Sequence, residues 1–328
     1  MPEGPELRLA ANFVNKIASS NVFGGSIVKG EKATKLADVP FSSPEYTVEA
    51  ESRGKELKLY LKDLAWSNNV KKIKHEVTHL LFRFGMSGSF KFTKNEEESI
   101  PKHAHLRFIT KDEKYMLSFV DYRRFGKWVI NGDWGKDRGP DPISNYMEFR
   151  SNVLSNLKNS AFNGPICEVL LNQKYFNGIG NYLRAEILYR CSIPPFDNAR
   201  EVLEPLSATD VKLKTKNDIN LNDVKLEIKN PDILQLCNII PNEVLSLSKR
   251  GKEYSADHDP ENDISFTDWL QCYMKEGMQN LVEKNGRTIW FSGPPGKLKP
   301  ENAKSRGGKW NSANVTILTV GEDDIKDE

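Results

Sequence analysis

The sequence predicts an α+β protein in which an antiparallel β domain is followed by a helical domain. Two observations carry this prediction. Between about residues 26 and 130, apolar residues alternate with polar ones at the period of strands, and strands and helices do not alternate regularly. From about residue 145, apolar residues recur three or four apart, which is the spacing of helices. A length of 328 residues suits about two domains, and we place the boundary near residue 135.

The first predicted element is a helix close to the N-terminus. Pro5 suits a first helical turn, and two glutamates favour the positive end of the helix dipole. Apolar residues then recur at helical spacing, at Leu7, Ala10, Phe13, Val14 and Ile17. In the β region that follows, Leu57, Leu59 and Leu61 alternate with polar side chains. The pattern predicts an antiparallel sandwich or a barrel-like domain and leaves both open.

The second domain reads as helical to about Met274. A polar stretch at 249–263 interrupts it, and we expect a loop there. A strand at 287–291 is followed by Gly-Pro-Pro-Gly at 293–296, which predicts the turn of a small hairpin. The acidic, low-complexity end of the chain predicts a disordered tail at 311–328.

Composition excludes several classes of protein. Hydrophobic residues make up 38% and charged residues 28% of the chain, as in ordinary soluble proteins. No run of about 18 apolar residues is present to span a membrane, and the N-terminus lacks the pattern of a secretory signal. A net charge of +2 does not by itself indicate a nucleic-acid partner. The widely spaced cysteines argue against a zinc site or a disulfide framework and favour a reducing compartment: Cys167, Cys191, Cys237 and Cys272.

Residues 1–6 combine a proline next to the initial methionine with two carboxylates. Removal of Met1 would leave Pro2 as a secondary amine, and an α-amino group with a reference pKa of about 8 is partly deprotonated near neutral pH. Such an amine attacks carbonyl carbons, and the resulting iminium is an electron sink. Glu3 and Glu6 lie close enough in sequence to protonate a leaving group or to move a proton. The alternative, which composition alone favours, is a well-started helix with no chemical role.

Three further positions place polar groups next to glycines. Two glycines precede Asn181 at the start of a predicted helix, so backbone N–H groups and the Asn181 amide are placed to face an anion such as phosphate. Lys55 lies beside a glycine at the start of a predicted strand, and Arg287 follows a glycine in a predicted hairpin turn. From both positions a cation can reach phosphate oxygens. The alternatives are a tight turn between helices at Asn181 and solvated cations at the other two positions.

Met86, Arg123 and Phe125 have the side chains needed to fill a gap in DNA. A protein that pulls a base out of a duplex must occupy the vacancy and hold the orphan partner, and a flexible apolar chain, a flat cation and an aromatic ring suit that task. Taken singly, each of these residues is more often part of a core or an ordinary surface.

Together these motifs resemble, in order and spacing, the Fpg/Nei family of DNA glycosylases. The matching segments are 1–6, 53–55, 177–181 and 286–288, and residues 82–90, 103–108 and 176–189 are most similar to the eukaryotic Nei-like 1 branch. The resemblance covers about residues 1–300. It implies an N-terminal helix with an antiparallel β-sandwich at 1–135, a helix-two-turn-helix domain at 136–280 and a finger hairpin at 281–310.

The hairpin departs from the pattern of most family members. They carry a zinc finger with four cysteine ligands, and those cysteines are missing here. The chain therefore resembles the branch with a metal-free "zincless finger", and we expect neither a metal nor a cofactor.

The resemblance also implies a role for each candidate residue. Pro2 corresponds to the nucleophile, Glu3 to the proton donor and Glu6 to a supporting carboxylate. Lys55 and Arg287 correspond to catalytic and DNA-binding cations, and the helix-two-turn-helix asparagine corresponds to Asn181. The void-filling residues correspond to Met86, Arg123 and Phe125. The loop that contacts the flipped base falls on Arg250, Lys252 and Tyr254, among which the sequence does not choose.

The function implied is that of a bifunctional DNA glycosylase and abasic-site lyase of base excision repair. We expect it to remove oxidised bases, mainly oxidised pyrimidines and hydantoin-type lesions, through a Schiff base with Pro2 followed by β,δ-elimination. Its expected partner is damaged DNA, as duplex, single strand or bubble, with downstream repair proteins as further partners. The family implies a monomer that acts in the nucleus and is not secreted.

Two alternatives come from other classes of protein. One is a damage-binding protein that lost turnover, against which the intact Pro2, Glu3 and Lys55 count. The other is a scaffold whose glycine motifs only make turns, which would show no salt-dependent affinity for DNA.

Overall fold

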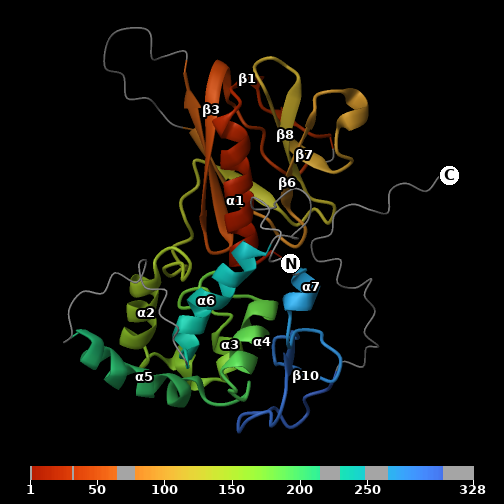
Figure 1. Ribbon diagram of the computed structural model, residues 1–328. Helices are drawn as coiled ribbons and strands as arrows, with labels where there is room; N and C mark the ends of the chain where they lie inside the picture. Colours follow the sequence, from red (N-terminus) through yellow and green to blue (C-terminus); the bar gives the residue numbers. More distant parts are fainter. Residues whose placement is uncertain (1, 32, 65–77, 215–229, 248–264, 306–328) are drawn as a thin grey trace, which may run out of the picture. The chain divides into compact units, whose positions relative to one another are not determined.

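The computed structural model describes residues 2–31, 33–64, 78–214, 230–247 and 265–305 (Figure 1). The predicted loop at 249–263 and the predicted tail at 311–328 lie outside these ranges. Within them, no helix combines the length and the apolar character needed to cross a membrane. Contacts between Cα atoms divide the chain into two compact units, the first at 2–136 and the second at 137–246 together with 265–305.

The first unit begins with helix α1 (Gly4–Ser19) and continues as strands. The strands are β1 (Phe23–Ser26), β2 (Val28–Lys29), β3 (Ser42–Arg53), β4 (Glu56–Asp63), β5 (Thr78–Arg83), β6 (Ser89–Lys94), β7 (Ala104–Ile109), β8 (Tyr115–Val120) and β9 (Lys127–Ile130), with a 3₁₀ turn, η2 (Glu97–Ser99), after β6. In the described residues they form a five-stranded sheet of order β1-β3-β4-β5-β9 and a four-stranded sheet of order β2-β7-β8-β6. All pairings are antiparallel. Of the two predicted architectures, the structure has the sandwich.

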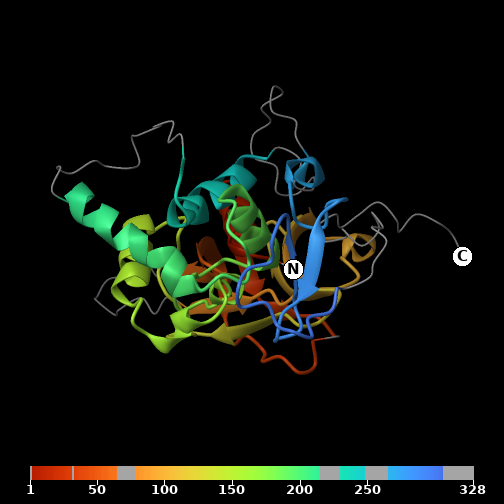
Figure 2. The same cartoon turned by 90° about the horizontal axis from the view of Figure 1, so that it is seen from below.

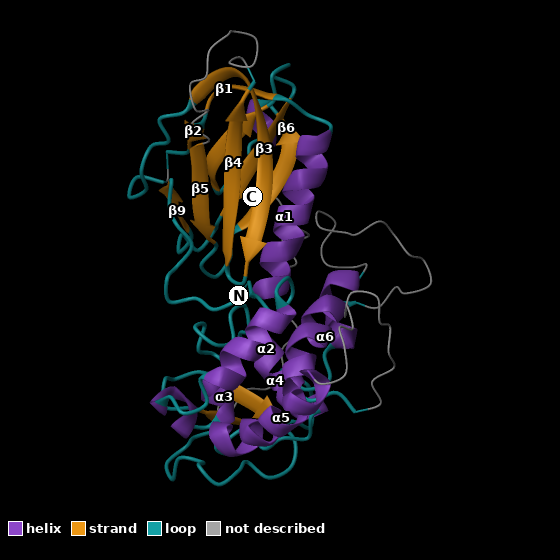
Figure 3. Cartoon of the chain, turned by 90° about the vertical axis from the view of Figure 1, so that its left-hand side faces the viewer, coloured by secondary structure: helices purple, strands orange, loops and turns teal. Residues whose placement is uncertain are grey.

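Apolar side chains from both sheets share one core with α1. Leu57 and Leu59 on β4 stand opposite Phe82 and Leu80 on β5, and all four side chains are fully buried. Burial of one such side chain stabilises the fold by about 1.5–3 kcal/mol. Helix α1 packs against β3, β4 and β6, and Figure 3 shows it lying along β3. The predicted helix is confirmed. Leu7, Ala10 and Val14 are buried as predicted, and Phe13 and Ile17 are half-buried against the same core.

The second unit is mainly helical. Its helices are α2 (Tyr146–Ser155), η3 (Ser160–Asn163), α3 (Ile166–Val169), α4 (Asn181–Arg190), α5 (Ala199–Lys214), α6 (Ile233–Ser246) and α7 (Phe266–Trp269), and its strands are β10 (Gln279–Val282) and β11 (Thr288–Phe291). Helix α4 is central because it packs against both α6 and β11. In Figure 2 the hairpin of β10 and β11, drawn in blue, lies beside α4.

The position of the hairpin turn confirms the turn predicted at Arg287 and corrects the one predicted at the Gly-Pro-Pro-Gly segment. Strand β11 pairs with β10, which precedes it, so the turn lies at 283–287 and not at the Gly-Pro-Pro-Gly segment. That segment instead contacts the backbone after α4. The N–H of Phe196 donates to the Pro295 carbonyl at 2.7 Å, and a Cβ on Gly296 would lie 2.6 Å from the Phe196 carbonyl carbon. The glycine at 296 is therefore needed for close packing.

Candidate functional site

Pro2, Glu3 and Glu6 lie together at the first turn of α1, and all three are buried. The N–H of Glu3 donates to Glu6 Oε2 at 2.6 Å, and the Glu3 carboxylate accepts from the N–H of Glu6, which completes a reciprocal capping box. Both carboxylates are thus held at the positive end of the helix, directly after Pro2. The helix-start interpretation is correct, and both acids lie in the first turn next to Pro2.

A side-chain amide ties α1 to the strand that leads to Lys55. Asn15 Nδ2 donates to the Ala50 carbonyl at 2.9 Å, and the Ala50 N–H donates to Asn15 Oδ1 at 2.7 Å. Strand β1 pairs with β3 only as far as Tyr46, so these Ala50 groups lie beyond the end of β1. The amide of Asn15 takes the place of a neighbouring strand there.

Lys55 lies in the two-residue turn between β3 and β4, one position before the strand on which the sequence suggested it. Arg53 pairs with Glu56 across the turn, and Gly54 has φ of 54°, which suits glycine at the first position of a type II′ hairpin turn. Glu56 is fully buried. Its Oε1 accepts from Arg83 Nε at 2.8 Å and Nη2 at 2.7 Å, and its Oε2 accepts from the Gly135 N–H at 2.9 Å. The backbone next to Lys55 is therefore fixed.

The three residues predicted to fill a DNA vacancy lie on two adjoining loops of the first unit. Met86 is 39% exposed and Phe125 58% exposed, so both large apolar side chains are accessible on these loops. The Arg123 guanidinium lies 5.5 Å from the centre of the Phe125 ring. Gly85 has φ of 63°, and a Cβ on it would lie 2.6 Å from the Phe125 carbonyl carbon. The structure brings together in space what the sequence separates by almost forty positions.

In the second unit, Asn181 connects the start of α4 to the hairpin. The turn before it contains Gly178 with φ of 94°, as the motif predicted. Asn181 Oδ1 accepts from Arg184 Nη2 at 2.6 Å, and Asn181 Nδ2 donates to the Thr288 carbonyl at 3.0 Å. Because Thr288 follows Arg287, this bond fixes α4 to the end of the turn that carries the arginine. Arg184 is fully buried and also donates to the Cys167 carbonyl at 2.9 Å.

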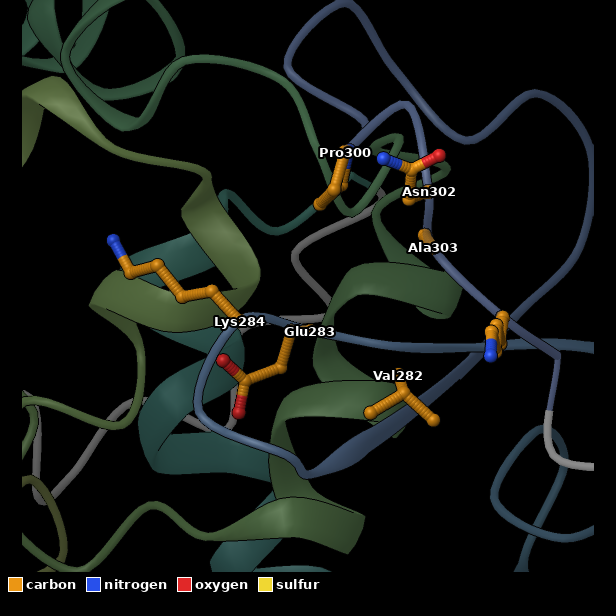
Figure 4. Close-up of a pocket in the computed structure, with 7 residues that line it drawn as sticks. Val282, Glu283, Lys284, Pro300, Asn302 and Ala303 are labelled. Atoms are coloured by element: carbon orange, nitrogen blue, oxygen red, sulfur yellow. The ribbon is translucent and has the colours of Figure 1, made fainter.

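The turn that carries Arg287 is organised by the carboxylate of Glu283, which is 2% exposed. Its Oε2 accepts from the N–H and from Nδ2 of Asn285, both at 2.9 Å, and its Oε1 accepts from the Arg287 N–H at 3.3 Å. Figure 4 shows the side chains of Glu283 and Lys284 leaving the turn in different directions. Lys284 Nζ lies 2.8 Å from Glu168 Oε2, and this hydrogen bond raises the pKa of Lys284.

Glu186 on α4 is a further buried acid that the sequence did not single out. Its Oε1 accepts from the N–H groups of Gln271, Cys272 and Tyr273 at 2.8–3.2 Å. These residues lead into the hairpin. Helix α4 therefore fixes the hairpin segment twice, through Glu186 before it and through Asn181 at β11.

Pro2, Glu3, Glu6, Lys55, Met86, Arg123 and Phe125 lie in the first unit, and Asn181 and Arg287 lie in the second. The lesion-loop residues Arg250, Lys252 and Tyr254 fall outside the described residues.

Two family models match the chain. Residues 1–128 match the formamidopyrimidine-DNA glycosylase N-terminal domain, and residues 264–300 match the DNA-binding domain of endonuclease VIII-like 1. The second match contains the hairpin and its Arg287 turn. Apart from Asn181 and the lesion-loop residues at 250–254, all candidate residues lie within the two matches.

Curated relatives resemble the chain over almost its whole length. Endonuclease 8-like 1 of Homo sapiens is 46% identical over 319 residues, which are 96% of this chain and 78% of the human protein. Endonuclease 8-like 1 of Mus musculus is 45% identical over 331 residues, which are 100% of this chain and 80% of the mouse protein. A formamidopyrimidine-DNA glycosylase of Prochlorococcus marinus is 33% identical over 161 residues, which are 46% of this chain and 53% of that protein.

Solved structures share the fold. The MutM (Fpg) protein of Thermus thermophilus has a TM-score of 0.58 at 21% identity, covering 89% of this chain and 97% of that protein. A complex of Lactococcus lactis Fpg (MutM) with DNA containing an oxidized pyrimidine has a TM-score of 0.60 at 18% identity, covering 88% and 97%. At these identities the likeness concerns the fold alone. The relatives and the family models establish more, and on them the chain belongs to the Fpg/Nei family of DNA glycosylases, within its endonuclease 8-like 1 branch.

Proposed function

We propose that this base excision repair glycosylase and abasic-site lyase uses Pro2 as its nucleophile and acts mainly on oxidised pyrimidines and hydantoin-type lesions. The observation that supports the proposal most strongly is the capping box at α1. It holds the Glu3 and Glu6 carboxylates, both buried, in the turn that directly follows Pro2. An amine and two acids within one helical turn are the groups that imine chemistry on a sugar requires.

The reaction begins once Met1 has been removed and the Pro2 nitrogen is neutral. The positive end of the α1 dipole disfavours a positive charge beside it, which helps to keep this amine unprotonated. Its lone pair forms a bond to C1′ of the damaged nucleotide as the bond from C1′ to the base breaks, and the proton of the Pro2 nitrogen passes to the departing base. Glu3 then donates a proton to the sugar ring oxygen as the C1′–O4′ bond breaks, and the nitrogen lone pair forms the iminium. Glu6 fixes the backbone of Glu3 through the 2.6 Å hydrogen bond and so sets the position of the donor.

The iminium formed on Pro2 then drives strand cleavage. Its positive charge acidifies C2′, which loses a proton, and the C3′–O bond breaks to release the 3′ phosphate. A second elimination releases the 5′ phosphate, and hydrolysis of the imine returns the Pro2 amine. No electron acceptor from outside is needed, because each elimination only moves electron pairs within the sugar and the imine.

We assign phosphate binding to Lys55, Asn181 and Arg287. Lys55 and Arg287 lie in turns whose backbones are fixed by Glu56 and Glu283, so each cation is presented from a defined position. Asn181 Nδ2 carries two hydrogens, and the bond to Thr288 uses one of them, which leaves one for a phosphate oxygen. Contacts to phosphate give affinity without sequence preference, as repair of scattered damage requires.

We propose that the lesion is recognised once the damaged nucleotide has flipped out of the duplex. Met86, Arg123 and Phe125 fill the vacancy and hold the orphan base, and Arg250, Lys252 and Tyr254 are the candidates for contacting the flipped base. We place the enzyme in the nucleus as a monomer on damaged duplex, single-stranded or bubble DNA, with downstream repair proteins as further partners.

Borohydride trapping tests the nucleophile. Wild-type protein on a damaged duplex should give a covalent adduct that maps by mass spectrometry to the peptide beginning with Pro2. The adduct should vanish in Pro2→Gly with Met1 retained. Pro5→Ala, which changes the other proline of the same helical turn, serves as the matched control and should still be trapped. An undiminished adduct in Pro2→Gly with Met1 in place would show that another amine attacks.

A further inference from the structure

We propose that Asp121 is the positioning residue that holds the two vacancy-filling loops in the arrangement that enters DNA. This inference rests on the proposed role of Met86, Arg123 and Phe125. Asp121 directly follows β8, and it is 1% exposed although its neighbours on the loop are exposed. A carboxylate so deeply buried must be satisfied by donors, and these donors come from both loops.

The carboxylate of Asp121 joins the loop of Met86 to the loop of Phe125. Its Oδ1 accepts from the Ser87 hydroxyl and from the Arg123 N–H at 3.2 Å, and its Oδ2 accepts from the Gly126 N–H at 2.6 Å. The Ser87 oxygen in turn accepts from the Arg123 N–H at 3.0 Å. One donor therefore belongs to Arg123 itself, and the other two belong to the residues that follow Met86 and Phe125.

The backbone of Asp121 is fixed to the sandwich. Its carbonyl oxygen lies 2.7 Å from Nε2 of His105, which is buried on β7. Its N–H donates to the His103 carbonyl at 3.1 Å. A movement of the Asp121 backbone would break these bonds to β7 and to the residue before it, so the sheet fixes the point from which the carboxylate holds both loops.

The loop conformation needs this support. Arg124 has φ of 58°, a left-handed conformation that is disfavoured for a residue with a side chain. Arg124 lies between the two backbone N–H groups that Asp121 accepts, so the charge-assisted bonds enclose the strained residue on both sides. Without these bonds, the exposed Met86 and Phe125 side chains would sample many positions. Ordering them on DNA would then cost conformational entropy, which would lower the affinity for DNA with a flipped nucleotide.

Asp121→Asn is the main test, because asparagine has the same shape but replaces one acceptor oxygen by a donor. That donor must face either the Gly126 N–H or the Ser87 and Arg123 donors. We expect excision of a lesion from duplex DNA to slow about tenfold, which corresponds to about 1.4 kcal/mol, the size of one hydrogen bond to a charged group. Strand cleavage at an abasic site in single-stranded DNA should change less than about twofold, because no vacancy or orphan base is present there.

A second readout follows the loops themselves. A 2-aminopurine base placed opposite a stable abasic analogue reports insertion beside the orphan base through its fluorescence. The fluorescence change on binding should be lost in Asp121→Asn and reduced in Ser87→Ala, a milder variant that removes one donor and keeps the carboxylate. Asp112→Asn is the matched control, because Asp112 is an exposed acid in the turn between β7 and β8 and lies away from both loops.

The outcomes separate this inference from the proposed function. If wild-type protein traps no adduct through Pro2, the proposed function fails. If wild-type protein is active and Asp121→Asn behaves like Asp112→Asn on duplex DNA, the positioning role of Asp121 is wrong. It is also wrong if Asp121→Asn slows single-strand cleavage as much as duplex excision, because general damage to the fold would then explain the loss.

Discussion

Replacing Glu283 by glutamine should weaken binding to abasic-site DNA, although it removes a negative charge. Glutamine has one acceptor oxygen where glutamate has two. If that oxygen keeps both bonds from Asn285, the Arg287 N–H, 3.3 Å from the other carboxylate oxygen, faces an amide donor. The turn then loses one weak hydrogen bond and the charge assistance of two others.

The size of the effect follows from these bonds. A hydrogen bond to a charged group contributes about 1.5–3 kcal/mol and one between neutral groups about 0.5–1.5 kcal/mol. The two bonds that change from charged to neutral therefore lose about 2 kcal/mol together. If the whole loss appears as poorer ordering of Arg287 in the complex, affinity falls by a factor of about 30. The loss cannot exceed that of Arg287→Ala, because the turn acts on DNA through that residue.

Fluorescence anisotropy with a duplex that contains a stable abasic analogue measures the loss, at several salt concentrations. Glu276→Gln is the matched control, since Glu276 is exposed in the segment before β10 and its replacement makes the same change in charge. Charge alone would tighten binding in both variants. The double variant Glu283→Gln with Arg287→Ala should bind no more weakly than Arg287→Ala. Unchanged affinity in Glu283→Gln, or additive losses in the double variant, would refute the reasoning.

Three further predictions concern the first turn of α1, its attachment and the buried thiols. Glu3→Gln should abolish base excision yet leave most cleavage at a preformed abasic site, and equal loss in the two assays would contradict a proton donor used mainly in the first step. Asn15→Ala should lower the free energy of unfolding by about 1–2 kcal/mol through two lost hydrogen bonds, measured by urea denaturation, whereas Asn12→Ala on the same helix should change little. Burial raises the pKa of Cys167 and of Cys191 from 9.0 to about 12. As pH rises, these thiols ionise in the unfolded chain before they ionise in the folded one, which favours unfolding. The free energy of unfolding should therefore fall as pH rises from about 9 towards 12. Equal values from denaturation at pH 8, 9 and 10 would be inconsistent with protonated buried thiols.

Features with a local cause could be predicted from the sequence. Helix α1 follows from Pro5 and an apolar spacing that needs no partner, and strand β4 follows from the alternation around Leu59. The start of α4 at Asn181 follows from the glycines before it. The turn predicted at 293–296 is wrong, because glycine and proline suit a turn, whereas here they pack against the backbone near Phe196, which is distant in sequence. Long-range packing of this kind leaves no local pattern.

The acids that organise the site were missed for a related reason. Acidic residues usually lie on the surface, so Asp121, Glu186 and Glu283 gave no signal of burial. Most of their partners are backbone N–H groups, which every residue except proline carries and which therefore leave no trace in the sequence. At Asp121 the sequence does carry a weak signal. An aspartate at the start of a loop favours a turn in which its side chain accepts from the N–H two residues later, and Asp121 accepts from Arg123 in this way.

The same device recurs at three elements proposed to contact DNA. Glu56 fixes the turn of Lys55, Asp121 fixes the loops of the inserting residues, and Glu283 fixes the turn of Arg287. Each buried carboxylate lowers the local positive potential, which by itself weakens attraction to any DNA. The net charge of the chain is only +2, so general affinity for DNA is modest in any case. A further loss of general affinity is tolerable if function depends on the difference in affinity between damaged and intact sites. Discrimination then depends on rigid presentation to a flipped nucleotide, which an intact duplex does not offer, and rising salt should weaken binding to intact DNA without removing the preference for the lesion.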